Sequence, residues 1–153
     1  MKDVILDPPG WFWKLFQVAQ GDDERFAELL KKLDQHQLIL LYSYMRDLAT
    51  AINGPDYQPH LAEGISDEGE FEVGLWVVTQ GRDRYREVAR DPQKIPGDER
   101  PGKRSERMMY GRIAEVYYDR FHDEIPTDFP IEWNEDGSPR TVQHHTNVAA
   151  QDE

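Results

Sequence analysis

The chain lacks cysteine altogether. This absence excludes disulfides, thiolate zinc sites and cysteine nucleophiles, and it suits a reducing compartment. The sequence also lacks any apolar run of the roughly 18 residues that a membrane-spanning helix needs, and no apolar stretch of signal-peptide length follows Met1. We therefore expect a cytoplasmic protein that does not enter a membrane.

Positive charge is scarce. The 153 residues include 18 Lys and Arg against 30 Asp and Glu, for a formal charge of −12, yet 38% are hydrophobic and 11% aromatic. That apolar content is too high for a disordered acidic chain, so we expect a folded domain. An acidic surface repels nucleic acid and favours a basic protein partner, although a net negative charge can also serve solubility alone.

Sequence motifs for catalysis are missing as well. The chain has no P-loop, no dinucleotide-binding glycine pattern and no Gly-x-Ser-x-Gly elbow. Its five histidines include no pair at the i, i+4 spacing of a helical zinc site. His122 stands between Asp119 and Asp123 in a helical segment, and a solvated helix face is the favoured explanation of that set. We predict no catalytic residue, no metal ligand and no cofactor, and a function without catalysis is the favoured hypothesis.

What is present is helical periodicity. Apolar residues recur every three to four positions, and capping residues precede several of these runs. The fold class predicted is mainly α, a compact bundle of about five to six helices with a small C-terminal hairpin or extended tail. Helices are expected over about residues 11–20, 23–33, 35–52, 67–80, 82–90 and 105–121.

The helices are expected to form a single domain over residues 1–140, followed by a disordered tail over 141–153. Residues 55–65 predict a loop with one short turn of helix, and residues 93–104 predict an exposed loop, because both are rich in Pro and Gly. The Asp136-Gly137 pair predicts a small hairpin within residues 130–142.

Basic residues gather in one band of the sequence. Residues 82–112 hold ten of the 18 basic side chains and six acidic ones, whereas the segments before and after each carry a net charge of −8. Ion pairs with neighbouring acidic helices are the favoured explanation. The alternative is a phosphate or carboxylate site formed by arginines of the band, namely Arg82, Arg84, Arg86, Arg104 and Arg107.

Candidate binding residues come from several features. Trp13 belongs to a helix with too many aromatic residues for all to be buried, so it is expected to be exposed. Asp67 and Glu68 begin a helix, where acids usually stabilise the helix end. Gln80 and Arg82 flank a glycine turn, where a binding cleft is the alternative to a structural role. The complete candidate set is Trp13, Asp67, Glu68, Gln80, Arg82, Arg86, Arg104, Arg107 and His122.

One stretch of the chain carries a family pattern. It contains Ser66-Asp67-Glu68-Gly69, then Trp76-Val77-Val78-Thr79-Gln80-Gly81-Arg82, then Tyr85, Ala89 and Asp91-Pro92. This stretch resembles a mostly bacterial group, domain-of-unknown-function family 4240, whose members have similar Ser-Asp-Asp-Gly, Trp-Leu-Ile-x-Gln-Gly-Arg and Asp-Pro patterns. Glu70 and Gly74 stand where that family usually has an aromatic residue and often has an arginine. The resemblance implies a compact helical bacterial domain and no particular reaction.

Three functional hypotheses stay open. The leading one is an acidic cytoplasmic binding module that docks a basic protein partner, in the manner of an immunity or antitoxin-like inhibitor. The first alternative is a small-molecule or anion-binding domain, with or without catalysis, in which Arg82, Arg86, Arg104 and Arg107 converge near His122. The second alternative is a structural or oligomerising domain. No nucleic acid or membrane partner is expected, and the sequence leaves the oligomeric state open.

Overall fold

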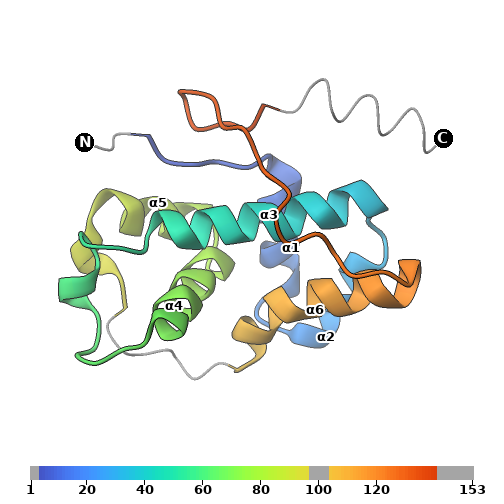
Figure 1. Cartoon of the computed structure of the whole chain (residues 1–153), viewed down its shortest axis with the longest axis horizontal. Helices are drawn as coiled ribbons and strands as arrows, with labels where there is room; N and C mark the ends of the chain where they lie inside the picture. Colours follow the sequence, from blue (N-terminus) through green and yellow to red (C-terminus); the bar gives the residue numbers. More distant parts are fainter. Residues whose placement is uncertain (1–3, 97–103, 141–153) are drawn as a thin grey trace.

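Helices make up most of the molecule. The computed structural model describes residues 4–96 and 104–140, with side chains in the second stretch from Met109 onward. Within these residues the α-helices are α1 (Gly10–Ala19), α2 (Asp23–Leu30), α3 (Gln35–Ala51), α4 (Asp67–Thr79), α5 (Arg82–Arg90) and α6 (Arg104–Phe121). Two short 3₁₀ helices, η1 (Gln58–His60) and η2 (Pro92–Lys94), lie in the connections. The predicted mainly α fold is confirmed (Figure 1).

The described ranges contain no β-strand, and none of their helices combines the length and the apolar character needed to cross a membrane. The predicted tail over residues 141–153 lies outside these ranges.

Side-chain caps set where several of the helices begin, among them α3 and α4. Asp34 accepts a hydrogen bond from the backbone N–H of Gln37 at 2.7 Å, and the Gln37 side chain accepts one from the Asp34 N–H at 3.0 Å. At the start of α4, Oγ of Ser66 accepts from the Gly69 N–H at 3.0 Å. These bonds satisfy backbone donors that have no partner inside the helix. Both capped starts were predicted from the sequence and are confirmed.

Helix α3 is the centre of the bundle. It runs across the molecule and packs against both α4 and α6 (Figure 1). Its Leu41, Met45 and Leu48 are fully buried. Where α3 meets α4, a Cβ added at Gly74 would lie 2.8 Å from the carbonyl oxygen of Ala49. The two backbones are therefore close enough to require glycine at this position.

Trp13 is buried, and the expectation that it is exposed was wrong. Its side chain is 8% exposed, and its ring centroid lies 6.0 Å from that of Tyr85 in α5. Its Nε1 donates to Oδ1 of Asp7 at 2.9 Å. The segment before α1 and the helix α5 thus cover a face of α1 that helical periodicity alone leaves in solvent.

The connection after α5 differs from the fully exposed loop expected over 93–104. It begins with η2, whose cap Asp91 accepts from the Gln93 N–H at 3.2 Å. Ile95 is only 5% exposed and joins the core. One apolar residue among charged ones therefore anchors the start of this connection, while residues 97–103 lie outside the described ranges.

After α6 the chain crosses α3 in an irregular, extended form (Figure 1). Arg46 of α3 holds this segment, because its Nη1 donates to the Thr127 carbonyl at 3.1 Å and its Nη2 to the Phe129 carbonyl at 3.0 Å. The next residue of α3, Asp47, accepts from Nε1 of Trp133 at 2.9 Å. Neighbouring polar residues of α3 thus position a segment that has no regular secondary structure of its own.

The predicted C-terminal hairpin is present as a tight turn. A single antiparallel bridge joins Trp133 to Pro139, and the Asn134 N–H donates to the Ser138 carbonyl at 2.7 Å. The turn also contacts the N-terminal segment, since the Asp7 N–H donates to the Gly137 carbonyl at 2.8 Å. The first and last described segments therefore lie side by side (Figure 1).

Candidate functional site

Four of the six cations of the basic band whose side chains the structure describes form ion pairs within the molecule, beginning with Arg82. Its Nε donates to Oδ1 of Asp7 at 2.9 Å, and its Nη2 donates to Oδ2 at 2.7 Å. Partial burial by itself raises the pKa of Asp7, but the hydrogen bonds from Arg82 and Trp13 outweigh it and hold the pKa of this carboxyl below its ordinary value. Arg82 therefore ties α5 to the N-terminal segment.

Other cations of the band are paired in the same way. Arg84 and Lys94 both contact Glu87, at 3.1 and 3.4 Å, and these hydrogen bonds lower the pKa of Glu87. Arg112 of α6 bonds Asp23, with Nε at 3.1 Å from Oδ2, and its Nη1 lies 2.9 Å from a carboxylate oxygen of Glu115. The predicted internal ion pairing is thus confirmed for these residues.

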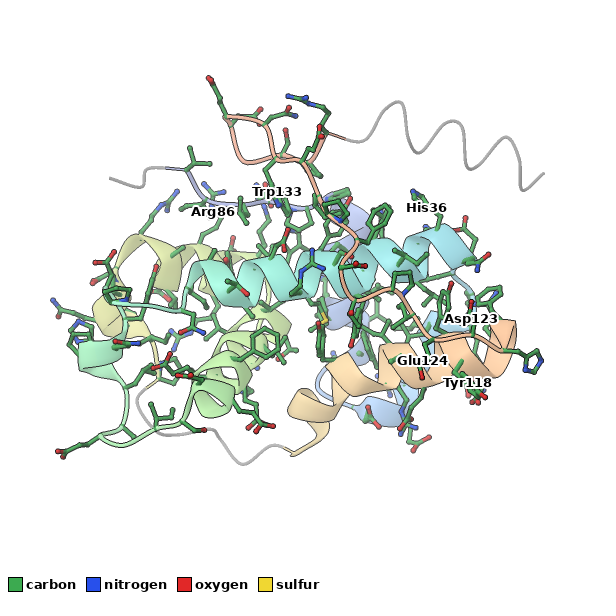
Figure 2. All side chains as sticks on the ribbon, in the orientation of Figure 1. His36, Arg86, Tyr118, Asp123, Glu124 and Trp133 are labelled. Atoms are coloured by element: carbon green, nitrogen blue, oxygen red, sulfur yellow. The ribbon has the colours of Figure 1, made fainter. Side chains whose placement is uncertain are left out.

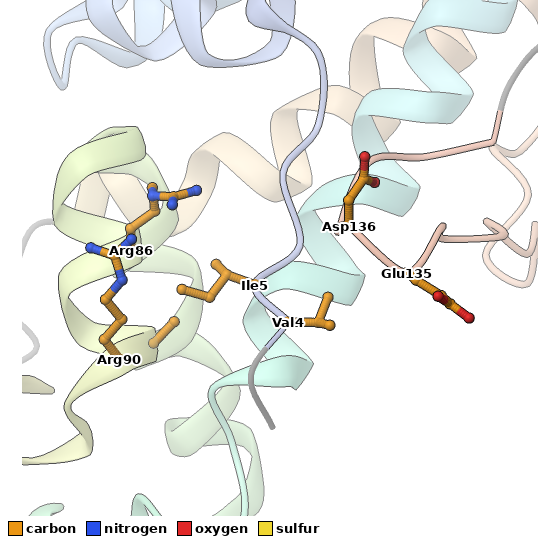
Figure 3. Close-up of a pocket in the computed structure, with 7 residues that line it drawn as sticks. Val4, Ile5, Arg86, Arg90, Glu135 and Asp136 are labelled. Atoms are coloured by element: carbon orange, nitrogen blue, oxygen red, sulfur yellow. The ribbon is translucent and has the colours of Figure 1, made fainter. Parts of the chain in front are cut away.

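Arg86 and Arg90 are the exceptions in α5. Their guanidinium groups form no ion pair with any residue that the structure describes, and both line a cavity of about 390 Å³. The cavity lies between α5, the N-terminal segment and the C-terminal turn, with Val4, Ile5, Ala89, Glu135 and Asp136 as its other lining residues (Figure 3). Arg86 was among the sequence candidates, whereas Arg90 was not.

The remaining candidates do not converge on this cavity. His122 is exposed and directly follows α6, whose C-terminal end lies at the other end of the molecule from α5 (Figure 1). The expected grouping of Arg82 and Arg86 near His122 was therefore wrong, because α5 and the end of α6 contact different parts of the bundle. The side chains of Arg104 and Arg107 lie outside the described part.

The candidates around α4 are also separate from one another. Asp67 and Glu68 are exposed in the first turn of α4, next to its Ser66 cap. Gln80 is exposed at the opposite end of that helix, where its Nε2 contacts Oγ1 of Thr79 at 3.4 Å. Because Asp67 and Glu68 lie at one end of α4 and Gln80 at the other, these residues do not form a shared site.

A second hollow lies where α6 ends, and the sequence did not single it out. Its volume is about 540 Å³, and its lining residues are Tyr42, Ala114, Glu115, Tyr118, Asp119, Glu124, Ile125 and Thr127. We call this hollow the acidic groove. Tyr118 is 55% exposed, which is unusual for a large aromatic side chain in this molecule. Figure 2 shows Tyr118 near Glu124 and Asp123, far along the long axis from Arg86.

The walls of the acidic groove are firmly placed. The Tyr42 ring stacks on Tyr110 with centroids 4.3 Å apart and planes 5° from parallel. Ile125 is buried, and Thr127 is held through its carbonyl by Arg46. The groove is therefore formed by an aromatic wall on α3, the last turns of α6 and an extended segment fixed to α3.

Two of the three carboxylates that line the acidic groove form no ion pair within the described residues. Asp119 and Glu124 form no ion pair with a cation in the described ranges, whereas Glu115 pairs with the half-buried Arg112, which also bonds Asp23. Arg120, the basic residue in the last turn of α6, donates instead to the carbonyls of Leu30 and Leu33 at 3.3 and 2.6 Å. The cation nearest in sequence is thus engaged at the end of α2.

The sequence contained part of the signal for this groove. Glu115, Tyr118 and Asp119 have the i, i+3 and i+4 spacing of one helix face. A solvated face explains such a pattern equally well, and Glu124 and Thr127 reach the groove only because the chain turns back after α6. The helix face becomes part of a hollow only through tertiary contacts, and sequence periodicity gives no information about these contacts.

The described side chains include no group of three or more His, Asp or Glu residues arranged to hold a metal ion. Comparisons with family models, with curated proteins and with solved structures give no match to this chain. The resemblance of residues 66–92 to domain-of-unknown-function family 4240 therefore stays a prediction.

Proposed function

We propose that the protein is a binding module that docks a basic segment of a protein partner in the acidic groove. The observation that carries the proposal is an exposed tyrosine, Tyr118, in a groove with two carboxylates, Asp119 and Glu124, that no described cation neutralises. A hollow of this kind suits a lysine or arginine side chain, which carries both a charge and an apolar stem.

The chemistry of the groove matches such a side chain at two points. A cation over the face of Tyr118 gains about 0.5–2 kcal/mol, depending on how far it is desolvated. Asp119 and Glu124 can accept charge-assisted hydrogen bonds from the same guanidinium or ammonium group. The formal charge of −12 adds long-range attraction, which raises the rate of encounter with a basic protein.

The proposal includes an immunity or antitoxin-like inhibitor as its most specific form, in which the module masks a basic protein in a bacterial cytoplasm. The absence of cysteine and the family resemblance support that setting.

The described large apolar side chains that are exposed, Val4, Val18 and Tyr118, lie on three different elements. Within the described part of the chain, these exposed side chains form no single patch that would favour the oligomerising alternative.

The test begins with capture at low salt of a stoichiometric partner by the tagged full chain, followed by titration calorimetry with the purified partner. The variant Asp119→Asn/Glu124→Gln, and separately Tyr118→Ala, should weaken binding by at least roughly tenfold. The control Asp56→Asn/Glu63→Gln removes the same amount of charge from exposed positions outside the groove. It should change affinity by less than about twofold.

Two results would count against this proposal. Equal weakening by the groove variant and by the control would show that overall charge, and not the groove, holds the partner. A captured partner whose binding is indifferent to salt and to Tyr118→Ala would place the interface elsewhere.

A further inference from the structure

The cavity beside α5 has the composition of a site for a small ligand. Arg86 and Arg90 lie one helical turn apart and line one wall of the cavity. Figure 3 shows them on one side of the N-terminal segment, with Glu135 and Asp136 of the C-terminal turn on the other side. A ligand lying over Ile5 would contact positive groups at one end and negative groups at the other.

Two carboxylates close to the arginines, Asp7 and Glu87, are already engaged by other side chains. Asp7 accepts from Arg82 and Trp13, and Glu87 contacts Arg84 and Lys94. Arg86 and Arg90 form no ion pair with a described residue, although Asp83 and Asp91 line a neighbouring hollow with them. Arg86 and Arg90 keep their donors on a helix that the Arg82–Asp7 pair ties to the N-terminal segment.

The opposite wall is also held in place. Oγ of Ser138 donates to Oδ1 of Asp136 at 2.6 Å, and the Ser138 N–H donates to the same oxygen at 2.9 Å. Hydrogen bonds from Ser138 lower the pKa of Asp136, which keeps this carboxyl ionised. The turn is fastened to the N-terminal segment by the bond from the Asp7 N–H to the Gly137 carbonyl at 2.8 Å. The cavity is therefore largely formed before a ligand arrives.

The charged side chains around the cavity restrict the class of ligand that it can bind. Two guanidinium groups match a phosphate monoester, which carries about −1.5 to −2 at neutral pH and accepts several hydrogen bonds. Glu135, which pairs with no described cation, repels a second anionic group and accepts hydrogen bonds from hydroxyls. A polyanion such as nucleic acid would meet this acidic wall and is disfavoured.

We propose that Arg86 and Arg90 bind the phosphate of a small phosphorylated polyhydroxy compound, a sugar phosphate, whose hydroxyl groups face Glu135. The cavity of about 390 Å³ is within the range of small-ligand sites. This site is separate from the acidic groove, so it neither needs nor excludes a protein partner.

Titration calorimetry of the full chain with glucose 6-phosphate tests the site, with inorganic phosphate and glucose as partial probes. Arg86→Gln/Arg90→Gln should weaken glucose 6-phosphate binding by at least roughly tenfold. The matched control Arg84→Gln/Lys94→Gln removes two positive charges from the same region and should have less than about a twofold effect. Glu135→Gln should weaken binding of glucose 6-phosphate while leaving that of inorganic phosphate unchanged.

The proposal is overturned if the wild-type chain shows no saturable binding of glucose 6-phosphate in the millimolar range. It is equally overturned if the two double variants lose affinity alike, which would indicate diffuse attraction, or if inorganic phosphate binds as tightly as the sugar phosphate. Chemical denaturation of each variant confirms that the fold is retained, so that lost binding reports on the cavity.

Discussion

The arginine cavity beside α5 and the acidic groove at the end of α6 carry opposite charge, and they arise in different ways. Around α5, Arg82, Arg84 and Lys94 pair with nearby carboxylates, whereas Arg86 and Arg90 line a hollow without an ion pair to a described residue. At the end of α6 the reverse holds, because Arg120 bonds carbonyls at the end of α2, and Asp119 and Glu124 form no ion pair with a described cation. The net charge of a segment therefore says less about binding than the pairing of each side chain.

The two regions share one structural device. Each hollow has a helix on one side and an irregular segment of chain on the other, and each irregular segment is fastened by few contacts. Gly137 fastens the wall beside α5, whereas Arg46 fastens the wall of the acidic groove. Changing these two residues should disturb one region at a time, which is a direct way to test whether the regions are independent.

The largest effect is expected for Gly137→Ala. Gly137 has φ of +95°, and a Cβ there would lie 2.1 Å from the carbonyl oxygen of Ile5. Backbone strain and the forced separation of the two segments should together lower the free energy of unfolding by about 2–4 kcal/mol, measured by urea denaturation. Hydrogen exchange should rise around residues 4–9 and 133–139 and stay unchanged at the acidic groove.

Gly64→Ala is the matched control for this experiment. Gly64 also has a positive φ, of +82°, but a Cβ there would contact nothing within 4 Å. Gly64→Ala should therefore lower the free energy of unfolding by about 1 kcal/mol, which is the effect of the backbone conformation alone. Equal destabilisation by the two substitutions would mean that the contact between the N-terminal segment and the turn contributes nothing.

Most of the helical frame could be predicted because its signals are local. The Asp34 and Gln37 capping box, the Ser66 cap and the periodic apolar residues of α3 act within a few positions of one another. Such interactions have the same form in a sequence window as in the folded chain. The fold class was therefore within reach of the sequence alone.

The candidate sites depended on contacts between distant positions. Trp13 is buried because Asp7 and α5 cover it, and Arg82 is neutralised by a residue 75 positions away. The acidic groove needs Tyr42 beside Thr127, which only the crossing of the C-terminal segment over α3 provides. The basic band showed where charge gathers, but only the tertiary structure shows that Arg86 and Arg90 are left over.

A smaller effect is expected for Arg46→Lys, which keeps the charge but cannot bridge two carbonyls. The guanidinium of Arg46 holds Thr127 and Phe129 at 3.1 and 3.0 Å. Loss of these two hydrogen bonds should lower the free energy of unfolding by about 1–2 kcal/mol. Partner binding at the acidic groove should weaken, while sugar phosphate binding beside α5 stays unchanged.

Arg120→Lys provides the comparison for that variant, since Arg120 also bonds two backbone carbonyls, those of Leu30 and Leu33. It should not increase hydrogen exchange at residues 127–129. If Arg46→Lys left exchange at these residues as slow as in the wild type, the wall of the groove would be held by something other than Arg46.

The smallest expected effect is the pH dependence from Asp7. Its pKa is lower in the folded protein than the ordinary value of 3.8, so the unfolded chain binds the proton more readily. The stabilisation by its bonds to Arg82 is therefore fully present above about pH 4 and is lost as the pH falls through the lower folded pKa. The free energy of unfolding, measured from pH 6 downward, should fall less steeply for Asp7→Asn than for the wild type. At pH 6 that variant should be less stable by about 1 kcal/mol, because the ion pair is partly exposed.

Asp83→Asn removes another carboxylate beside Arg82, one that makes no ion pair with a described cation, and should leave the wild-type slope unchanged. Parallel curves for Asp7→Asn and the wild type would mean that the bond between α5 and the N-terminal segment does not depend on this charge.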